Sequence, residues 1–397
     1  MMKVAIMGYG TVGSGVYEVI RTNQASIDKK VGEELRIKYV LDLREFPGDS
    51  VMEVLTHNFD DIVNDEEVKV VAEVMGGLRP AYDFTKRCLE AGKSVCTSNK
   101  ELVAKHGAEL IQIAKDHNVN YLFEASVGGG IPIIRPINSS LTADVLLEIS
   151  GILNGTTNYM LTKMANEGMD YADVLKEAQA KGYAELHPEA DVEGWDPCRK
   201  IAILTSLASG RQVDFEDIYT EGITKITTED FAYAKTLDRA IKLVASSKKV
   251  GDTYCAMVSP VMIHRDHPLF MVNDVFNAVF VKGNMLGDSM FYGAGAGKLP
   301  TASAVAGDIV EAARNLGKTL PVFWDQEKLK LAPMSGASRR FFVRMKEGAD
   351  VSVFGDVEMV EGGIAGEVGF ITPVMTEAEY AAKAEKAEII SMIRVEG

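Results

Sequence analysis

The sequence predicts an α/β protein whose first third forms a parallel sheet and whose remainder mixes helices with antiparallel strands. Three observations support this fold class. Short apolar runs typical of buried strands alternate with amphipathic helical patterns over about the first 130 residues. Strand-like segments then dominate much of the second half. A chain of 397 residues is also too long for one ordinary hydrophobic core, which indicates two or three domains.

Composition narrows the class of protein. A hydrophobic content of 47% and a charged content of 25% are typical of soluble globular proteins. The net charge of -15 argues against sequence-independent binding to nucleic acid or to anionic membranes. The 4 cysteines are scattered, which suggests reduced thiols, and no apolar run reaches the roughly 18 residues of a membrane span. We therefore expect a cytoplasmic protein that acts on small molecules, with no nucleic-acid or membrane partner.

The first candidate site is the turn after the first expected strand. Residues 3–13 read KVAIMGYGTVG, in which an apolar strand leads through a G-x-G-x-x-G pattern into a helix. In such a turn the glycines permit a tight bend, close approach of a pyrophosphate and helix packing, while the helix start offers free N–H groups. A tight turn without a ligand would also explain the glycines. The dinucleotide interpretation assigns the cofactor contacts to Gly8, Gly10, Thr11, Val12 and Gly13.

The following segments continue the alternation expected of a Rossmann-type domain. Strands are expected at residues 35–43, 68–77, 93–98 and 119–126, and helices at 80–92 and 100–118. Asp42, at the end of the second strand, is placed to bind ribose hydroxyls and would favour NAD. Arg44 could instead pair with a 2′-phosphate and favour NADP, so the preference stays open.

Two further features of this region have both a functional and a structural interpretation. Lys100 opens a helix, where a cation is unfavourable against the helix dipole, so a bound negative charge could explain it. A solvated lysine is the alternative. Glu124 precedes three successive glycines whose carbonyls, with that carboxylate, could bind a hard cation. A tight turn explains them equally well.

An unusual acidic stretch lies in the middle of the chain. Residues 182–200 contain five carboxylates and end in a helix with Asp196 at the expected N-cap and Pro197 at the first helical position. Lys200 lies four residues after Asp196, so both side chains lie on one side of the first turn. An ion pair on a surface helix would explain these two residues, but it leaves Glu185 and Asp191 unexplained.

The last part of the chain is expected to form a mixed sheet and a small terminal unit. Residues 228–251 read as one helix, residues 253–263 and 274–293 as antiparallel strands, and residues 300–316 as a helix that returns to the nucleotide domain. From about residue 336 the sequence predicts a small β-rich unit with one helix.

Six motifs in this order resemble homoserine dehydrogenase. They are the GxGxVG turn, SNKE, EASVGGGIPII, GILNGTTNY, GYAE…DVEGWD…K and GAGAGKLPTASAV. The resemblance covers about four-fifths of the chain. It implies NAD- or NADP-dependent interconversion of L-aspartate 4-semialdehyde and L-homoserine in threonine, methionine and isoleucine biosynthesis, by a homodimer or homotetramer. The terminal segment resembles a shortened ACT-type regulatory unit but lacks its usual P-G-x-L helix, so threonine control and a purely structural tail both stay open.

The resemblance also assigns site residues. Lys200 matches the proton donor, Asp196 its catalytic neighbour, and Lys100 a lysine near nicotinamide and substrate. The implied substrate residues, which would bind the charged amino-acid substrate (a zwitterion), are Glu185, Asp191, Thr156, Gly155 and Tyr183. The implied further cofactor contacts are Gly76, Ser98, Lys100, Gly182, Gly295 and Gly297, beside Asp42 and Arg44. The implied Na⁺ or K⁺ site consists of Glu124 and the carbonyls of Val127, Gly129 and Ile131.

The expected domains are a Rossmann domain at 1–130 joined by helix 300–316, a substrate-binding and dimerisation domain at 131–299, and the ACT-like unit at 336–397. Two other functions compete with the dehydrogenase. One is a dinucleotide-binding sensor without catalysis, which the joint presence of Lys100, Glu185, Asp196 and Lys200 disfavours. The other is a semialdehyde dehydrogenase with Cys96 as nucleophile, which the position of Cys96 within an apolar strand disfavours.

Overall fold

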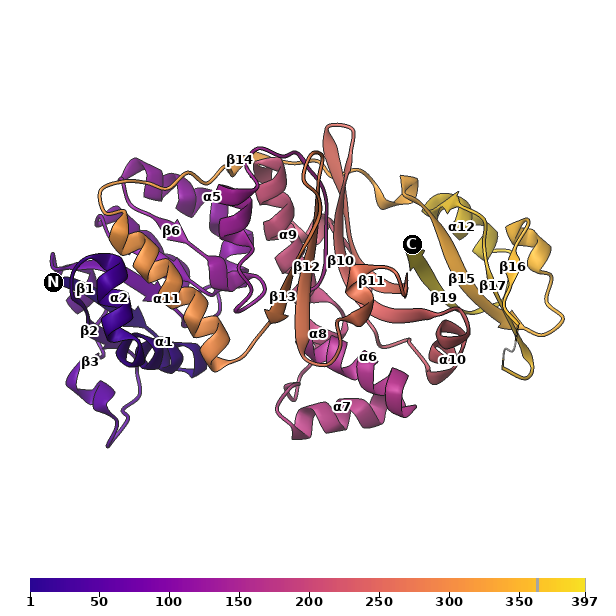
Figure 1. Ribbon diagram of the computed structural model, residues 1–397, viewed down its shortest axis with the longest axis horizontal. Coiled ribbons are helices and arrows are strands. Elements are labelled where there is room, and N and C mark those ends of the chain that lie inside the picture. The colour runs from indigo at the N-terminus through magenta and orange to yellow at the C-terminus, as the bar shows by residue number, and fades with distance from the viewer. Residues whose placement is uncertain (362–363, 397) are drawn as a thin grey trace. The chain divides into compact units, whose positions relative to one another are not determined.

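The structure is a computed structural model that describes residues 1–361 and 364–396 (Figure 1). Its contacts divide the chain into two compact units, each assembled from three separate segments. Unit 1 comprises Met1–Ala143, Ser206–Asp214 and Gly293–Leu329, and unit 2 comprises Asp144–Thr205, Phe215–Tyr292 and Lys330–Gly397. The expected three-domain division stays a prediction; the contacts group the terminal segment with unit 2.

Unit 1 is built on a six-stranded sheet in the order β3-β2-β1-β4-β5-β6, in which every neighbouring pair is parallel. The predicted parallel-sheet α/β fold is therefore confirmed. The order reverses between β1 and β4, and in open α/β sheets ligands bind outside the carboxyl ends of the strands at such a reversal. The strands are β1 (Met2–Met7), β2 (Leu35–Leu41), β3 (Leu55–Thr56), β4 (Val68–Glu73), β5 (Ser94–Thr97) and β6 (Tyr121–Leu122).

Helices connect these strands, and one comes from far along the chain. Helix α11 (Lys298–Arg314) packs against α1 (Thr11–Thr22), where a Cβ on Gly15 would lie 2.8 Å from the Cβ of Ala302 (Figure 1). Glycine is thus required for this close helix contact. The other helices and the short strand pair of unit 1 are α2 (Gln24–Val31), α3 (Asp60–Val63), α4 (Ala81–Glu90), α5 (Lys100–Asp116), β8 (Arg211–Gln212) and β14 (Asp325–Lys328).

The last predicted strand of unit 1 is shorter than expected. Residues 119–126 were predicted as one strand, but only Tyr121–Leu122 pairs with β5, and Glu124–Ser126 form a 3₁₀ turn (η2). The backbone turns away because the Glu124 carboxylate accepts hydrogen bonds from the N–H groups that follow the glycine run. The η2 turn also forms one wall of a cavity in unit 1.

Unit 2 contains an eleven-stranded mixed sheet. Its main order is β13-β12-β7-β10-β11-β19-β15-β17-β16, with β18 beside β15 and β9 beside β11. β11 pairs in parallel with β9 and β19, and the other described pairs are antiparallel, as expected for a mixed sheet. The strands are β7 (Leu146–Ile152), β9 (Tyr219–Thr220), β10 (Arg239–Val250), β11 (Thr253–His264), β12 (Phe276–Gly283), β13 (Gly287–Ala294), β15 (Ser338–Lys346), β16 (Glu358–Met359), β17 (Glu367–Ile371), β18 (Met375–Thr376) and β19 (Ile389–Glu396).

The predicted helix over residues 228–251 is wrong in its second half. Helix α10 ends at Thr236, Asp238 adopts φ 53°, and residues Arg239–Val250 form β10, which pairs with β11 along its whole length. The left-handed conformation of Asp238 stops the helix and redirects the chain into the sheet.

The helices of unit 2 hold the candidate substrate residues. They are α6 (Gly155–Glu167), α7 (Tyr171–Ala180), α8 (Glu189–Val192), α9 (Trp195–Ser209, which continues into unit 1), α10 (Thr228–Thr236) and α12 (Glu377–Ala384).

The terminal segment has a core of its own that includes Phe341, Phe354 and Tyr380, while β19 continues the main sheet. Its ACT-like identity stays a prediction. Among the described residues, no helix combines the length and the hydropathy that crossing a bilayer requires.

Candidate active site

The glycine turn of unit 1 has the geometry that a dinucleotide requires. Gly8 lies between β1 and α1 at φ 101°, and a Cβ on Gly13 would lie 1.9 Å from the Gly8 carbonyl oxygen. In the described part of the chain nothing lies within 4 Å of a Cβ built on Gly10, so a ligand can approach the backbone there. Gly10 is also the N-cap of α1 and offers no side chain to the first N–H groups. Thr11 and Val12 start this helix, whose N–H groups suit a pyrophosphate.

Asp42 and Arg44 form one unit at the end of β2. The Asp42 carboxylate accepts hydrogen bonds from Arg44 Nε at 2.9 Å and Nη2 at 3.0 Å, and from the Tyr9 N–H at 2.8 Å. The hydrogen bonds and charge of Arg44 hold the pKa of Asp42 well below its usual range. Asp42 is thus ionised and fixed next to the glycine turn, with an exposed guanidinium beside it. Both NAD and NADP interpretations of the sequence are compatible with this pair.

Buried polar groups connect the ends of β4 and β5. The fully buried Glu73 accepts hydrogen bonds from the Thr97 hydroxyl at 2.7 Å and the Met75 N–H at 2.9 Å. Burial raises the pKa of Glu73 above its ordinary value. Asn99 donates to the Gly77 carbonyl at 2.6 Å and caps α5 through the Leu102 N–H. Sequence reasoning missed Glu73, although a glutamate inside an apolar strand is a recognisable signal.

These contacts fix the segments that hold three predicted residues. Gly76 follows β4 at φ 81°, and Ser98 and Lys100 follow β5, with Lys100 as the first residue of α5. All three lie at the carboxyl ends of neighbouring parallel strands, where the fold places ligands.

In unit 2 the structure brings four side chains of the acidic stretch and the preceding turn together. Lys200 Nζ donates to the Leu153 carbonyl at 2.6 Å and to Asp196 Oδ2 at 2.8 Å. Asn154 Nδ2 donates to the same Asp196 oxygen at 2.8 Å and to Asp191 Oδ1 at 2.7 Å. Asn154, Asp196 and Lys200 are 6%, 5% and 9% exposed. We call Asn154, Asp191, Asp196 and Lys200 the amide–carboxylate cluster.

Local sequence explains how the cluster forms. β7 ends at Ile152, and Asn154 caps α6 by accepting the Thr157 N–H at 2.9 Å, which turns its amide group toward α9. The predicted N-cap role of Asp196 is wrong. Helix α9 begins at Trp195, two residues before the expected first helical position Pro197. Asp196 therefore lies inside the first turn, and its carboxylate accepts hydrogen bonds from Lys200 and Asn154.

Other predicted substrate residues lie around the start of α6. The Thr156 hydroxyl donates to the Tyr183 carbonyl at 2.6 Å, which ties α6 to the acidic stretch. Gly155 opens α6, where a Cβ would lie 2.8 Å from the Val275 carbonyl oxygen. The Tyr183 ring packs edge-on against Tyr159 at 5.0 Å, and Gly182 turns the chain at φ 74°. Glycine is therefore needed at residues 155 and 182 for space and for backbone conformation, respectively.

Glu185 lies apart from the described hydrogen bonds of the cluster. It is exposed, and its backbone carbonyl accepts from Gln179 Nε2 at 3.0 Å. Of the five carboxylates noted in residues 182–200, Asp191 and Asp196 join the described network, while Glu185, Glu189 and Glu193 are exposed. The stretch therefore combines an ordered polar site with a solvated face.

The glycine run of unit 1 forms a closely packed loop. The Glu124 carboxylate accepts the N–H groups of Ile133 at 2.5 Å, Ile134 at 2.9 Å and Arg135 at 2.7 Å. A Cβ on Gly129 would lie 2.4 Å from the Gly295 carbonyl oxygen, and Gly297 at φ 116° caps α11. Among the described residues, no cluster of three or more His, Cys, Asp or Glu side chains suits a metal ion. A cation near Val127, Gly129 and Ile131 would therefore depend on backbone carbonyls, with the Glu124 carboxylate already engaged.

The cysteine alternative has no geometric support. Cys96 is fully buried in β5, and this burial raises the pKa of its thiol well above the ordinary value. A nucleophilic cysteine needs access and a stabilised thiolate. Cys96 is a core residue.

Comparison with known proteins finds homoserine dehydrogenases over most of the chain. The family model "Homoserine dehydrogenase, NAD binding domain" matches residues 8–124, and "Homoserine dehydrogenase" matches residues 132–310. The Bacillus subtilis homoserine dehydrogenase is 39% identical over 96% of this chain and 90% of its own. A Thiobacillus denitrificans homoserine dehydrogenase structure superposes with a TM-score of 0.91 at 33% identity, covering 100% of this chain and 98% of its own. A hyperthermophilic archaeal homoserine dehydrogenase solved with NADPH has a TM-score of 0.69 at 27% identity, over 81% and 99% of the two chains.

The fold, the nucleotide turn and the extent of these matches lead to one conclusion. The chain belongs to the homoserine dehydrogenase family of NAD(P)-dependent oxidoreductases.

Proposed function

We propose that the amide–carboxylate cluster is the substrate site of this homoserine dehydrogenase and that Lys200 is its proton donor. The observation that carries the proposal is the buried contact of Lys200 with Asp196 and the Leu153 carbonyl. Removing an ammonium from water is costly unless acceptors replace the solvent. A charge held this way is oriented before substrate arrives.

The chemistry of aldehyde reduction fits a fixed ammonium. Bound NAD(P) supplies or accepts the hydride, and its fit rests on the open backbone at Gly10 and the uncapped start of α1. As L-aspartate 4-semialdehyde is reduced, negative charge develops on the carbonyl oxygen. Lys200 stabilises that charge and donates the proton. In the reverse direction the Lys200 amine accepts the hydroxyl proton of L-homoserine.

The carboxylates have separate roles in this scheme. Asp196 orients Lys200, and Asn154 links Asp196 and Asp191 by donating a hydrogen bond to each carboxylate. Asp191, half-buried, and Glu185, exposed, supply negative charge for the substrate's α-ammonium group. Thr156, Gly155 and Tyr183 shape the entrance. Lys100, Ser98 and Gly76, together with Gly182, Gly295 and Gly297, are assigned to the nicotinamide half of the cofactor.

The test is a Lys200→Met variant, which keeps the length of the side chain and removes its charge. We expect turnover of L-homoserine to fall by about 10²–10⁴-fold, the usual contribution of a general acid. Binding of NADPH, followed by its fluorescence, should change less than about twofold. Lys176→Met removes a side chain that is 76% exposed and serves as the control. Turnover within about threefold of the unaltered enzyme in a folded Lys200→Met protein would contradict the assignment.

For the cofactor, we propose that the enzyme accepts both NADP and NAD, with Arg44 available to the 2′-phosphate. The archaeal relative solved with NADPH supports the phosphorylated form as a ligand.

We also propose a monovalent cation, Na⁺ or K⁺, bound by Glu124 and the backbone carbonyls of Val127, Gly129 and Ile131. Turnover should then be higher in KCl or NaCl than in choline chloride at equal ionic strength, and equal rates would exclude a functional cation. A homodimer or homotetramer in the cytoplasm stays a prediction of the sequence.

A further inference from the structure

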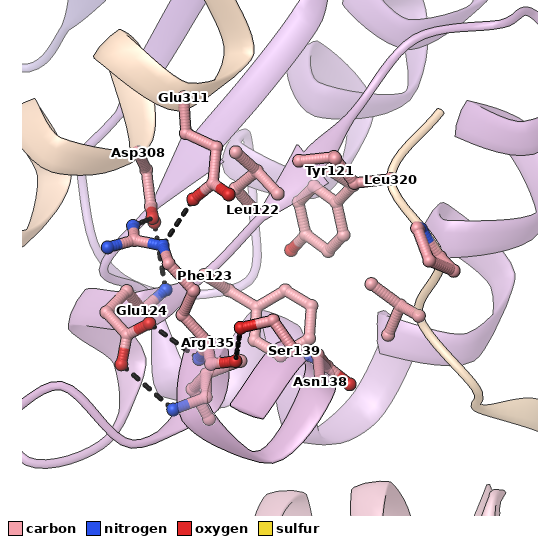
Figure 2. Close-up of a pocket in the computed structure, with 13 residues that line it drawn as sticks. Tyr121, Leu122, Phe123, Glu124, Arg135, Asn138, Ser139, Asp308, Glu311 and Leu320 are labelled. Carbon is pink, nitrogen blue, oxygen red and sulfur yellow. Dashed lines mark hydrogen bonds and ion pairs between the residues drawn. The ribbon is translucent and has the colours of Figure 1, made fainter. Parts of the chain in front are cut away.

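A cavity of about 110 Å³ lies in unit 1 beneath the end of β6 (Figure 2). β6, the η2 turn, residues 134–139, α11 and residues 320–322 surround it. Its wall is mostly apolar and includes Phe123, Ile134, Leu320 and Val322. An engineered apolar cavity of about 150 Å³ binds benzene, so this space suits a molecule of about six heavy atoms.

One polar group, the Tyr121 hydroxyl, is directed into this apolar space. Tyr121 is 2% exposed, and among the residues that the structure describes its hydroxyl has no hydrogen-bond partner. Figure 2 shows the hydroxyl pointing from β6 toward the middle of the cavity, near the Phe123 ring. An unpaired buried hydroxyl costs about 1–3 kcal/mol, so the fold carries a penalty here that a ligand can remove. A ligand that supplies one hydrogen-bond acceptor would satisfy Tyr121.

Charged residues line the opposite side and set the sign of the ligand. Arg135 Nη2 contacts Asp308 Oδ1 at 2.6 Å, and Arg135 Nε pairs with Glu311, so two carboxyl groups neutralise this guanidinium (Figure 2). The buried Glu124 lies beside them and adds a third carboxyl group. Three carboxyl groups and one guanidinium line this side, so they would repel an anionic ligand but not a neutral one.

We propose that this cavity binds a small neutral molecule with a branched or cyclic apolar body and one carbonyl-type acceptor, and that Tyr121 donates a hydrogen bond to that acceptor. The cavity shares no lining residue with the amide–carboxylate cluster, because all its lining residues belong to unit 1 and the cluster belongs to unit 2. Its wall includes Glu124, whose carboxylate organises the loop after η2. An occupied cavity would therefore stabilise that loop.

The experiment compares two probes of equal size and different charge, isobutyramide and isobutyrate, each with six heavy atoms. Saturation-transfer NMR and thermal unfolding would follow their binding to the full-length protein at pH 7.5. For a ligand of this size we expect isobutyramide to bind with a Kd on the order of 1 mM. At 20 mM it should raise the unfolding midpoint by about 2–4 °C. Isobutyrate should bind at least about tenfold more weakly.

Variants locate the binding. Tyr121→Phe removes only the hydroxyl and should weaken isobutyramide binding by about 2–10-fold, the range of a single hydrogen bond. Asn138→Trp places a large ring at the partly exposed rim and should abolish binding. Tyr171→Phe, in unit 2, should leave the Kd unchanged. Both cavity variants should keep unaltered homoserine turnover, which distinguishes this proposal from the assignment of Lys200.

The opposite results are equally definite. Binding of isobutyramide that survives both cavity variants, or that homoserine displaces, would place the probe at the substrate site and overturn the proposal. Absence of saturable binding up to 50 mM, with only ordered water beside Tyr121 in an experimental density map, would overturn it as well.

Discussion

Asn154→Asp is the sharpest perturbation of the amide–carboxylate cluster, because it changes one NH₂ group to an oxygen and preserves shape. Asn154 Oδ1 would still accept the Thr157 N–H and cap α6. The other terminal atom now donates to Asp191 and Asp196 at 2.7 and 2.8 Å. In the variant it becomes an acceptor facing two acceptors, so two charge-assisted hydrogen bonds become repulsive contacts.

The magnitude follows from these distances. Two unit charges 2.8 Å apart repel by about 6 kcal/mol at an effective dielectric constant of 20. This repulsion exceeds the free energy needed to protonate one carboxyl group. We therefore expect the folded variant to bind one extra proton on this group of carboxylates rather than keep all of them charged. Keeping a group with an ordinary pKa near 4 protonated at pH 7 costs about 4 kcal/mol. The variant should therefore lose about 4 kcal/mol of unfolding free energy at pH 7, and less at lower pH.

The sign of the pH dependence is specific. The extra carboxyl pKa is raised in the folded state, so between pH 4 and that raised value the folded chain binds more protons than the unfolded chain. Its unfolding free energy then decreases as the pH rises through this window, and the loss is smallest near pH 4. Urea unfolding of the variant and the unaltered protein at pH 5 and pH 7.5 measures it, beside Asn154→Ser, which adds no charge. A deficit for Asn154→Asp that is equal at both pH values, or absent, would refute the reasoning.

Two further predictions concern single charged side chains. In steady-state assays, Arg44→Ala should lower kcat/KM for NADP by about 10–100-fold and that for NAD by less than threefold, because charge-assisted hydrogen bonds to phosphate are stronger than neutral hydrogen bonds. Equal losses with both cofactors would exclude the phosphate role of Arg44. Burial lowers the pKa of Lys242 to about 8, below the 10.5 of the unfolded chain. Between these pH values the unfolded chain therefore binds more protons than the folded chain. Relative to Lys242→Met, the unfolding free energy of the unaltered protein should rise by about 1–3 kcal/mol from pH 8 to pH 10.5. A difference between the two proteins that stays constant with pH in urea unfolding would contradict the lowered pKa.

Most of unit 1 could be predicted from the sequence because its signals are local. The glycines at residues 8, 10 and 13 specify a turn through their own conformation and the space around them. The strand and helix periodicities are read within single segments. The β6 region is the exception, since Glu124 shortens the strand through hydrogen bonds to residues nine to eleven positions later. That interaction leaves no periodic pattern in the sequence.

The helix predicted across residues 228–251 shows how tertiary pairing overrides a helical pattern. RAIKLVASSKKV contains Ala, Leu and Lys, all good helix formers, and follows a genuine helix. Its twelve residues instead pair with β11 on one side, and four of them pair with β7 on the other. β7 lies about ninety residues earlier in the chain, beyond the range of pattern-based inference. Asp238 was the available signal, because aspartate tolerates the left-handed conformation better than most residues.

In the candidate site, too, only the contacts between residues close in sequence could be predicted. Lys200 and Asp196 could be paired from their spacing of four residues on one helix. Asn154 is 42 residues from Asp196, and its role depends on where β7 ends relative to α9, which only the folded chain defines. In the sequence, Asn154 stands out only as part of the GILNGTTNY motif. The Asn154 amide donates to both carboxylates and so allows Asp191 and Asp196 to lie next to the buried Lys200. Sequence spacing could not assign this role, and the pH dependence of the Asn154→Asp variant measures it directly.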